Sequence, residues 1–146
     1  SRTTSITKSV GIFVIITKSM KLRFNTNSIR FRLSKEDIDY LNNSKLVSVS
    51  IPFGPKSGDN FSYSIIQTKG SKIDLSYANN HLRLFIPQQL ADDWILSEKV
   101  GFSERFSLSQ ECELFILVEK DFQCLQPREF EDETLNFPNP LANRLL

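Results

Sequence analysis

The sequence predicts an α+β fold of about eight mostly antiparallel strands with two or three short helices, in a barrel-like or a two-sheet arrangement. Two observations lead to this fold class. Short runs in which apolar and polar residues alternate recur along the chain, which is typical of strands covered on one face. Two segments with helix-start signals each follow one pair of such runs and precede another, so the order strand, strand, helix, strand, strand occurs twice.

The first half of this pattern begins with a hairpin and continues into a short helix. Asn25-Thr26-Asn27 separates the first two strands and consists of residues common in turns. Ser34 is a favourable N-cap residue, and Asp37 gives the helix a start that resembles a capping box. The predicted elements are strands at 21–24 and 28–33, a helix at 34–43, and strands at 47–51 and 61–67.

The second half shows the same order. Ala78-Asn79-Asn80 is a hairpin turn signal, and Pro87 suits the first position of a helix in which Trp94 belongs to the apolar set. Residues 113–118 are almost continuously apolar, which is typical of a central strand covered on both faces. The predicted elements are strands at 72–77 and 81–86, a helix at 87–96, and strands at 99–106 and 113–118.

The chain has 146 residues, which is enough for one domain with a buried core. Residues 1–19 lack an initiating Met, whereas Met20 directly precedes a clear strand pattern. We therefore expect the α+β domain to occupy 20–142 and residues 1–19 to be a non-native N-terminal extension. When the second half is laid on the first, Arg83 falls on Arg30 and Pro87 falls on Ser34. The predicted parts of the domain are pseudo-repeats at 20–68 and 71–120 and an acidic C-terminal segment at 121–142.

Composition excludes some classes of function and leaves enzymatic activity open. The net charge is only +1, so we expect neither nucleic acid nor a membrane surface as a partner. The apolar run at 10–16 is too short to cross a bilayer. Cys112 and Cys124 form no CxxC pair, and His81 is the single histidine, so a structural zinc site is not expected. We interpret both thiols as reduced and the protein as cytoplasmic.

Basic residues are concentrated on the first predicted hairpin. If two residues connect its strands, Lys21 lies opposite Arg32. Arg23 then lies opposite Arg30, and the apolar residues of both strands share the other face. Like charges directly opposite each other destabilise a strand pair by some tenths of a kcal/mol. Three explanations stay open: the charges are screened by water and salt, they are covered by the chain's own carboxylates, or they bind an anionic ligand.

The carboxylates that could cover these cations lie near the end of the chain. Glu113 and Glu119 share parity on the last strand and point to one face of it. A C-terminal segment folded back over the hairpin would act as an acidic clasp. The same carboxylates resemble a hard-cation cluster, although no EF-hand spacing is present. The clasp or metal candidates are Glu113, Glu119, Glu129, Glu131, Asp132 and Glu133.

An anionic ligand could bind to the arginines, because their planar guanidinium groups form paired hydrogen bonds with phosphate or carboxylate. Arg83 would add a contact from the second half of the chain. The anion-binding candidates are Lys21, Arg23, Arg30, Arg32 and Arg83. Two other reactive residues are interpreted structurally. His81 lies beside a turn and is expected to be exposed or to cap it, and Cys124 beside Leu125 is expected to pack.

The segments KLRFNTNSIRFRLS and VEKDFQCLQPREFEDE, with the later NFPNP, resemble a family of short uncharacterised bacterial proteins, a domain of unknown function. The resemblance covers Met20 to Ala142. It implies a bacterial cytosolic protein, and it implies no particular activity, because none is known for that family.

The layout of two strand–strand–helix–strand–strand units is also similar to the triphosphate-tunnel (CYTH) fold. That resemblance implies that Arg23, Arg30, Arg32 and Arg83 bind phosphate and that Glu113 and Glu119 bind Mg²⁺. The E-x-E-x-K motif of the first strand in that family is absent, because the strand here reads Lys-Leu-Arg-Phe. Likeness of layout alone is a weak argument for function.

From these patterns we predict a small soluble protein that acts as a non-enzymatic binding or interaction domain, with a basic strand face covered by an acidic C-terminal clasp and with no cofactor. The alternative is a Mg²⁺-dependent phosphohydrolase or a polyphosphate- or nucleotide-binding protein of triphosphate-tunnel type. The sequence does not identify a partner: a small anionic ligand, a partner protein and a homodimer through an exposed strand edge all stay open.

Overall fold

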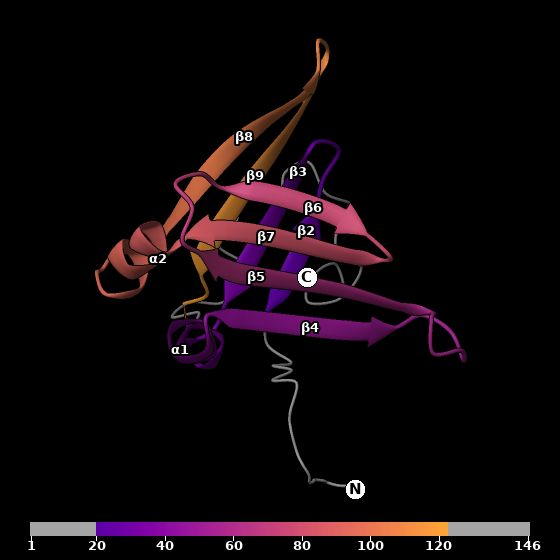
Figure 1. Ribbon diagram of the computed structural model, residues 1–146, viewed down its shortest axis with the longest axis horizontal. Helices are drawn as coiled ribbons and strands as arrows, with labels where there is room; N and C mark the ends of the chain where they lie inside the picture. The colour runs from indigo at the N-terminus through magenta and orange to yellow at the C-terminus, as the bar shows by residue number, and fades with distance from the viewer. Residues whose placement is uncertain (1–19, 123–146) are drawn as a thin grey trace, which may run out of the picture.

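The structure is a computed structural model that describes residues 20–122, and it confirms the α+β fold class. The described residues form eight strands and two helices, and the strands make two four-stranded sheets (Figure 1). The elements are β2 Lys21–Phe24, β3 Ser28–Leu33, α1 Lys35–Ser44, β4 Leu46–Pro52, β5 Asn60–Thr68, β6 Asp74–Ala78, β7 His81–Pro87, α2 Gln88–Ile95, β8 Gly101–Ser109 and β9 Cys112–Lys120.

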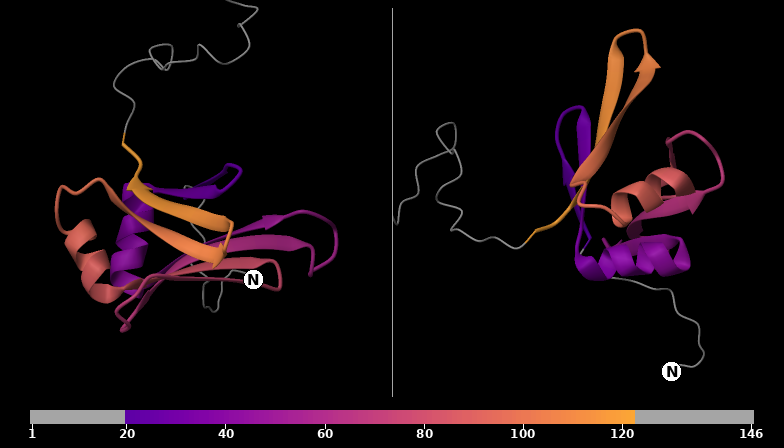
Figure 2. Two further views of the ribbon diagram at one scale, coloured as in Figure 1. Left: turned by 90° about the horizontal axis from the view of Figure 1, so that it is seen from above. Right: turned by 90° about the vertical axis from the view of Figure 1, so that its left-hand side faces the viewer.

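The two sheets lie face to face with their strands crossing, and both helices lie at one end of the sandwich (Figure 2). One sheet has the strand order β2-β3-β9-β8, and the other has the order β4-β5-β7-β6. Four of the six strand pairs are antiparallel, whereas β3–β9 and β5–β7 are parallel. Over residues 20–122 the sheets do not close into a barrel, so the two-sheet arrangement is the one that the chain adopts.

Each sheet takes one hairpin from each half of the chain. The parallel pair β3–β9 joins the first hairpin to the last, and the parallel pair β5–β7 joins the two hairpins in between. The order strand, strand, helix, strand, strand is therefore present in both halves, but neither half completes a sheet by itself. A pseudo-repeat in the sequence itself stays a prediction.

The core lies between the sheets and under the helices. Alternate residues of the strands point inward, and Phe31, Ile65 and Leu84 are fully buried there. Trp94 of α2 is also fully buried, as predicted, and its Nε1 donates a hydrogen bond to the Val100 carbonyl at 3.0 Å. Truncation of an aromatic core residue to alanine typically costs about 3–5 kcal/mol, so Phe31 and Trp94 contribute strongly to the stability of the fold.

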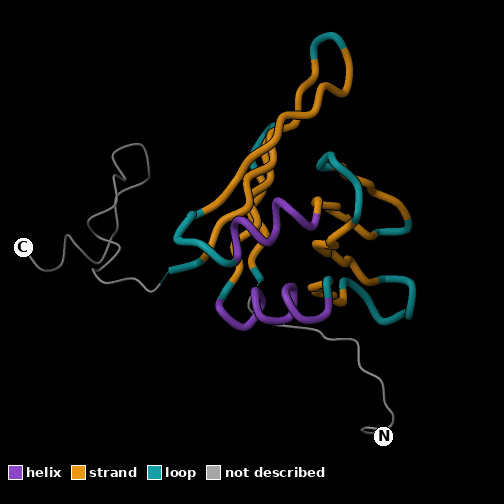
Figure 3. The backbone as a smooth tube through the Cα atoms, turned by 60° about the vertical axis from the view of Figure 1, so that its left-hand side comes forward, coloured by secondary structure: helices purple, strands orange, loops and turns teal. Residues whose placement is uncertain are grey.

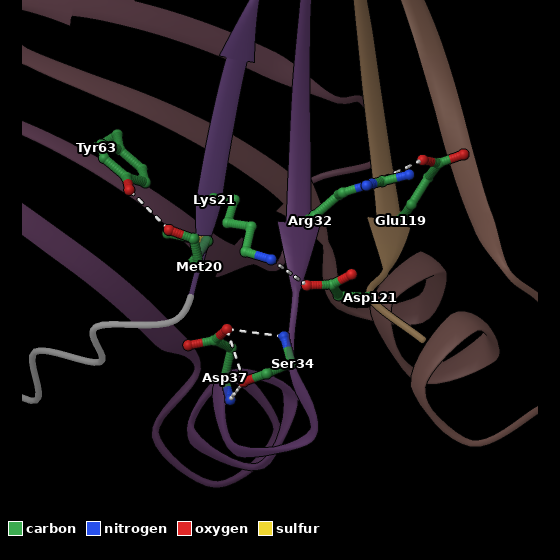
Figure 4. Close-up of polar contacts among 8 residues, drawn as sticks. All are labelled: Met20, Lys21, Arg32, Ser34, Asp37, Tyr63, Glu119 and Asp121. Carbon is green, nitrogen blue, oxygen red and sulfur yellow. Dashed lines mark hydrogen bonds and ion pairs between the residues drawn. The ribbon is translucent and has the colours of Figure 1, made fainter. Parts of the chain in front are cut away.

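The start of α1 and the entry of the chain into the core are both fixed by hydrogen bonds. The predicted capping box is confirmed: the Asp37 backbone N–H donates to Ser34 Oγ at 3.2 Å, and the Ser34 backbone N–H donates to Asp37 Oδ2 at 2.8 Å (Figure 4). The Tyr63 hydroxyl donates to the Met20 carbonyl at 2.7 Å. This bond ties β5 of one sheet to the residue that precedes β2 of the other.

Two details differ from the sequence prediction. β9 is the central strand expected, but it is not covered on both faces, because Ile116 and Val118 are buried whereas Phe115 and Leu117 are only half-buried. Pro87 ends β7 and is the N-cap of α2, one position before the helix instead of at its first residue. The β8–β9 hairpin also extends past the other strands (Figure 3), since β3 pairs with β9 only from Phe115 onward.

Candidate functional site

The predicted register of the first hairpin is confirmed, and it places the cations on the outer side of the sheet. Lys21 is paired with Arg32, and Arg23 is paired with Arg30. Because Ile29 and the other apolar residues of β3 point into the core, its arginines point away from it. We call the outward side chains of this sheet the basic face, and its charged members are Lys21, Arg23, Arg30, Arg32, Arg105, Glu113 and Glu119.

One carboxylate, that of Glu119, forms ion pairs with two arginines of the basic face. The parallel pairing of β3 with β9 sets Glu119 opposite Arg32. Glu119 Oε1 lies 3.4 Å from Arg30 Nε and 3.8 Å from Arg32 Nε (Figure 4 shows the second pair). All three side chains are partly exposed, so each pair contributes only about 0–1 kcal/mol.

A second carboxylate reaches the basic face from the end of β9. Asp121 Oδ2 lies 3.1 Å from Lys21 Nζ (Figure 4). The Asp121 backbone N–H donates to the Leu33 carbonyl at 2.8 Å, which holds the chain beside the end of β3. The first acidic residue after the last strand is therefore already in contact with one cation of the hairpin.

These contacts leave positive charge in excess. β2 and β3 carry four outward cations, and Glu119 and Asp121 are the carboxylates paired with them in the described part of the chain. Within residues 20–122, Arg23 has no ion pair. The basic face is thus able to accept further carboxylate or phosphate groups.

On β8 and β9 the basic face contains both charged and apolar side chains. Arg105 of β8 lies over the ring of Phe115, with 5.6 Å from its guanidinium carbon to the ring centroid. Arg105 Nη1 also lies 3.8 Å from Glu113 Oε1, between two well-exposed side chains. Leu117 lies between these residues and the cations of β3, paired with Arg30. The surface can therefore contact a ligand that has both acidic and apolar groups.

Arg83 does not join the basic face. It lies on β7, in the other sheet, paired with Ser64 of β5. It alternates with the buried Leu82 and Leu84, so it points to the outer side of that sheet. Arg83 and the arginines of the basic face therefore lie on opposite outer sides of the sandwich, so Arg83 is not placed to add a contact to an anion bound at Arg30.

His81 is neither a simple surface residue nor a cap. Its Nε2 lies 2.6 Å from Ser64 Oγ, and Ser64 Oγ lies 2.8 Å from Ser48 Oγ. Burial lowers the pKa of His81 below its usual value, and the neighbouring Arg83 lowers it further. Ser64 is only 1% exposed, so its hydroxyl is a structural partner and not an accessible nucleophile. This contact has no local signal in the sequence, because it depends on the pairing of β5 with β7.

The metal and tunnel interpretations find no matching geometry. Glu113 and Glu119 each pair with arginine, and among residues 20–122 no group of three or more His, Cys, Asp or Glu side chains is placed to hold a metal ion. Apolar side chains fill the space between the sheets, where a tunnel would bind phosphate. The remaining candidates, Glu129, Glu131, Asp132 and Glu133, lie outside the described residues.

Comparison with known proteins gives one match. A family model described as "Family of unknown function (DUF7009)" matches residues 20–141. No curated protein and no solved structure matches the chain. In the part of the chain that the structure describes, neither helix has the length and apolar character needed to cross a membrane.

Proposed function

The chain belongs to DUF7009, a family of unknown function, and we propose from its own geometry that it is a non-enzymatic interaction domain whose basic face is covered by its acidic C-terminal segment. One observation carries this proposal. The opposed pairs Lys21–Arg32 and Arg23–Arg30 place four cations on a two-stranded ribbon. Within residues 20–122, only two carboxylates, Glu119 and Asp121, form ion pairs with them. An arrangement of like charges of this kind favours the binding of an additional anion.

The acidic segment supplies the missing charge and is tethered close by. Residues 129–133 contain four carboxylates, and the first of them, Glu129, is the seventh residue after Phe122, where the described chain ends. Seven extended residues span up to about 25 Å. Strand β3, with six residues, is about 20 Å long. The acidic segment can therefore reach the four cations of β2 and β3.

The spacing of the acids also matches the spacing of the cations. Glu129, Glu131 and Glu133 occupy alternate positions, so an extended segment would present them on one side. Arg30 and Arg32 alternate in the same way along β3, with Leu117 and Phe115 on the neighbouring strand. An extended acidic peptide that also carries apolar residues, from this chain or from a partner protein, is the ligand that fits this surface best.

The alternative of a Mg²⁺-dependent phosphohydrolase requires cations and carboxylates that converge inside an enclosed site. Here the cations lie on outer sheet faces, and the carboxylates Glu113 and Glu119 are paired with arginines instead of being grouped together. No described feature favours that chemistry, so the interaction domain is the function that we propose.

A double-mutant cycle tests the proposal. One variant carries Arg30→Gln and Arg32→Gln, the second carries Glu129→Gln, Glu131→Gln and Glu133→Gln, and the third combines them. If the acidic segment covers the basic face, the free energies of unfolding should be non-additive by more than about 0.5 kcal/mol. The coupling should vanish in about 1 M salt, where the Debye length falls to roughly 3 Å.

Arg83→Gln is the matched control, since it removes a cation from the outer side of the other sheet. Its effect should add to that of the acidic-segment variant. Additive effects for Arg30 and Arg32 as well would mean that the basic face is only screened by solvent, and they would overturn the proposal.

A further inference from the structure

A cavity of about 670 Å³ lies between α1, α2 and the ends of β3 and β9. Leu33, Ile38 and Ile95 give it an apolar lining, and the exposed residues Lys35 and Asp39 also line it. Leu33 is fully buried, whereas Ile38 and Ile95 are only partly buried although both are large and apolar. The exposed part of this lining is a surface that a further apolar group would cover favourably.

The described chain ends at the mouth of this cavity. Lys120 is the last residue of β9, and its Nζ donates to the Ser97 carbonyl at 2.7 Å, just beyond α2. The Asp121 backbone N–H is held by the Leu33 carbonyl at 2.8 Å. Phe122 then lines the cavity itself. The next residues of the chain therefore start beside the cavity.

We infer that Cys124 and Leu125 occupy this cavity and anchor the C-terminal segment between the two helices. They are the first apolar pair after Phe122, and Leu125 follows it by three positions. Three residues span at most about 11 Å, so the pair cannot move far from the mouth of the cavity. A reduced cysteine behaves as a small apolar side chain and suits such a position.

The anchor strengthens the proposed function but does not rest on it. A fixed point at Leu125 would raise the effective concentration of Glu129–Glu133 over the basic face. Apolar docking between the helices would nevertheless persist if those acids bound nothing. Salt separates the two effects, because it weakens charge pairs and not apolar contacts.

Thiol labelling of the unsubstituted 146-residue chain tests the anchor directly. Cys112 lies exposed at the start of β9 and serves as an internal reference. The rates at which N-ethylmaleimide modifies the two thiols are followed by mass spectrometry of the digested protein. We expect Cys124 to react roughly tenfold more slowly than Cys112, in low salt and in about 1 M salt alike. Equal rates would overturn the inference and leave the cavity open to a small amphiphile or to a partner's side chain.

Disulfide trapping gives a second measurement in a Cys112→Ser chain. Ile38→Cys or Ile95→Cys should form an intramolecular disulfide with Cys124, since a bond requires Cα atoms within about 7 Å. Glu36→Cys is the matched control, because it is exposed on the same helix and does not line the cavity. We expect trapping roughly ten times faster at the lining positions than at Glu36. Similar rates at all three positions would contradict the anchor.

Discussion

Arg23 and Arg30 stand directly opposite each other on β2 and β3, and of the two only Arg30 has a carboxylate partner within residues 20–122. The effect of removing Arg23 on stability therefore distinguishes a basic face that is covered by carboxylates from one that is only solvated. If solvent alone screens the pair, removal of Arg23 relieves repulsion. If an acidic segment lies over the face, removal of Arg23 also deletes an attractive contact.

Arg23→Gln should therefore lower the free energy of unfolding by about 0.5–1 kcal/mol in the 146-residue chain, which retains the acidic segment. The physical reason is the loss of a charge pair with the acidic segment, which outweighs the repulsion from Arg30. Urea denaturation at low and high salt measures the change. An unchanged or increased stability would show that nothing acidic covers this position.

His81 should make stability depend on pH in the weakly acidic range. Burial, with a smaller effect of Arg83, lowers the pKa of His81 in the folded protein, so the unfolded chain binds the proton more readily. Stability is thus fully present above the unfolded pKa of about 6.5 and falls as the pH decreases from there toward the folded pKa. The free energy of unfolding of the natural chain and of His81→Gln, measured at several pH values, should differ in slope across this window. Identical slopes would exclude His81 as the source.

Ser34→Ala should destabilise the chain by about 1 kcal/mol. The change removes the hydroxyl that accepts from the Asp37 backbone and donates to the buried Asp37 carboxylate at 2.9 Å. Glu36→Ala is the control, since Glu36 is exposed in the same turn. Thermal unfolding should show a clear decrease for Ser34→Ala and a small one for Glu36→Ala. Equal changes would mean that the capping box contributes nothing specific.

Local features of this fold were predictable from the sequence. The hairpin register followed from a side-chain period of two, because a shift by one residue would have buried the cations of β2 and β3. The capping box followed in the same way from the spacing of Ser34 and Asp37. In both cases the contact lies within a few residues along the chain.

Contacts between distant segments could not be predicted in this way. The parallel pairing of β3 with β9 decides that Glu119 lies beside Arg32, and the pairing of β5 with β7 places Ser64 beside His81. Neither pairing has a local signal, since both join segments that are separated by other elements. The separation of Arg30 from Arg83 has the same origin, because the two halves of the chain exchange hairpins between the sheets.

The most direct measurement is calorimetric titration of a chain that ends at Gln126 with a synthetic peptide of residues 127–140. The peptide should bind, its affinity should decrease with added salt, and the affinity should fall about fivefold for each lost charge pair, as in Arg30→Gln or in a peptide with Glu131→Gln. A peptide that does not bind, or that binds equally well to the Arg30→Gln chain, would contradict the claim that the acidic segment covers the basic face.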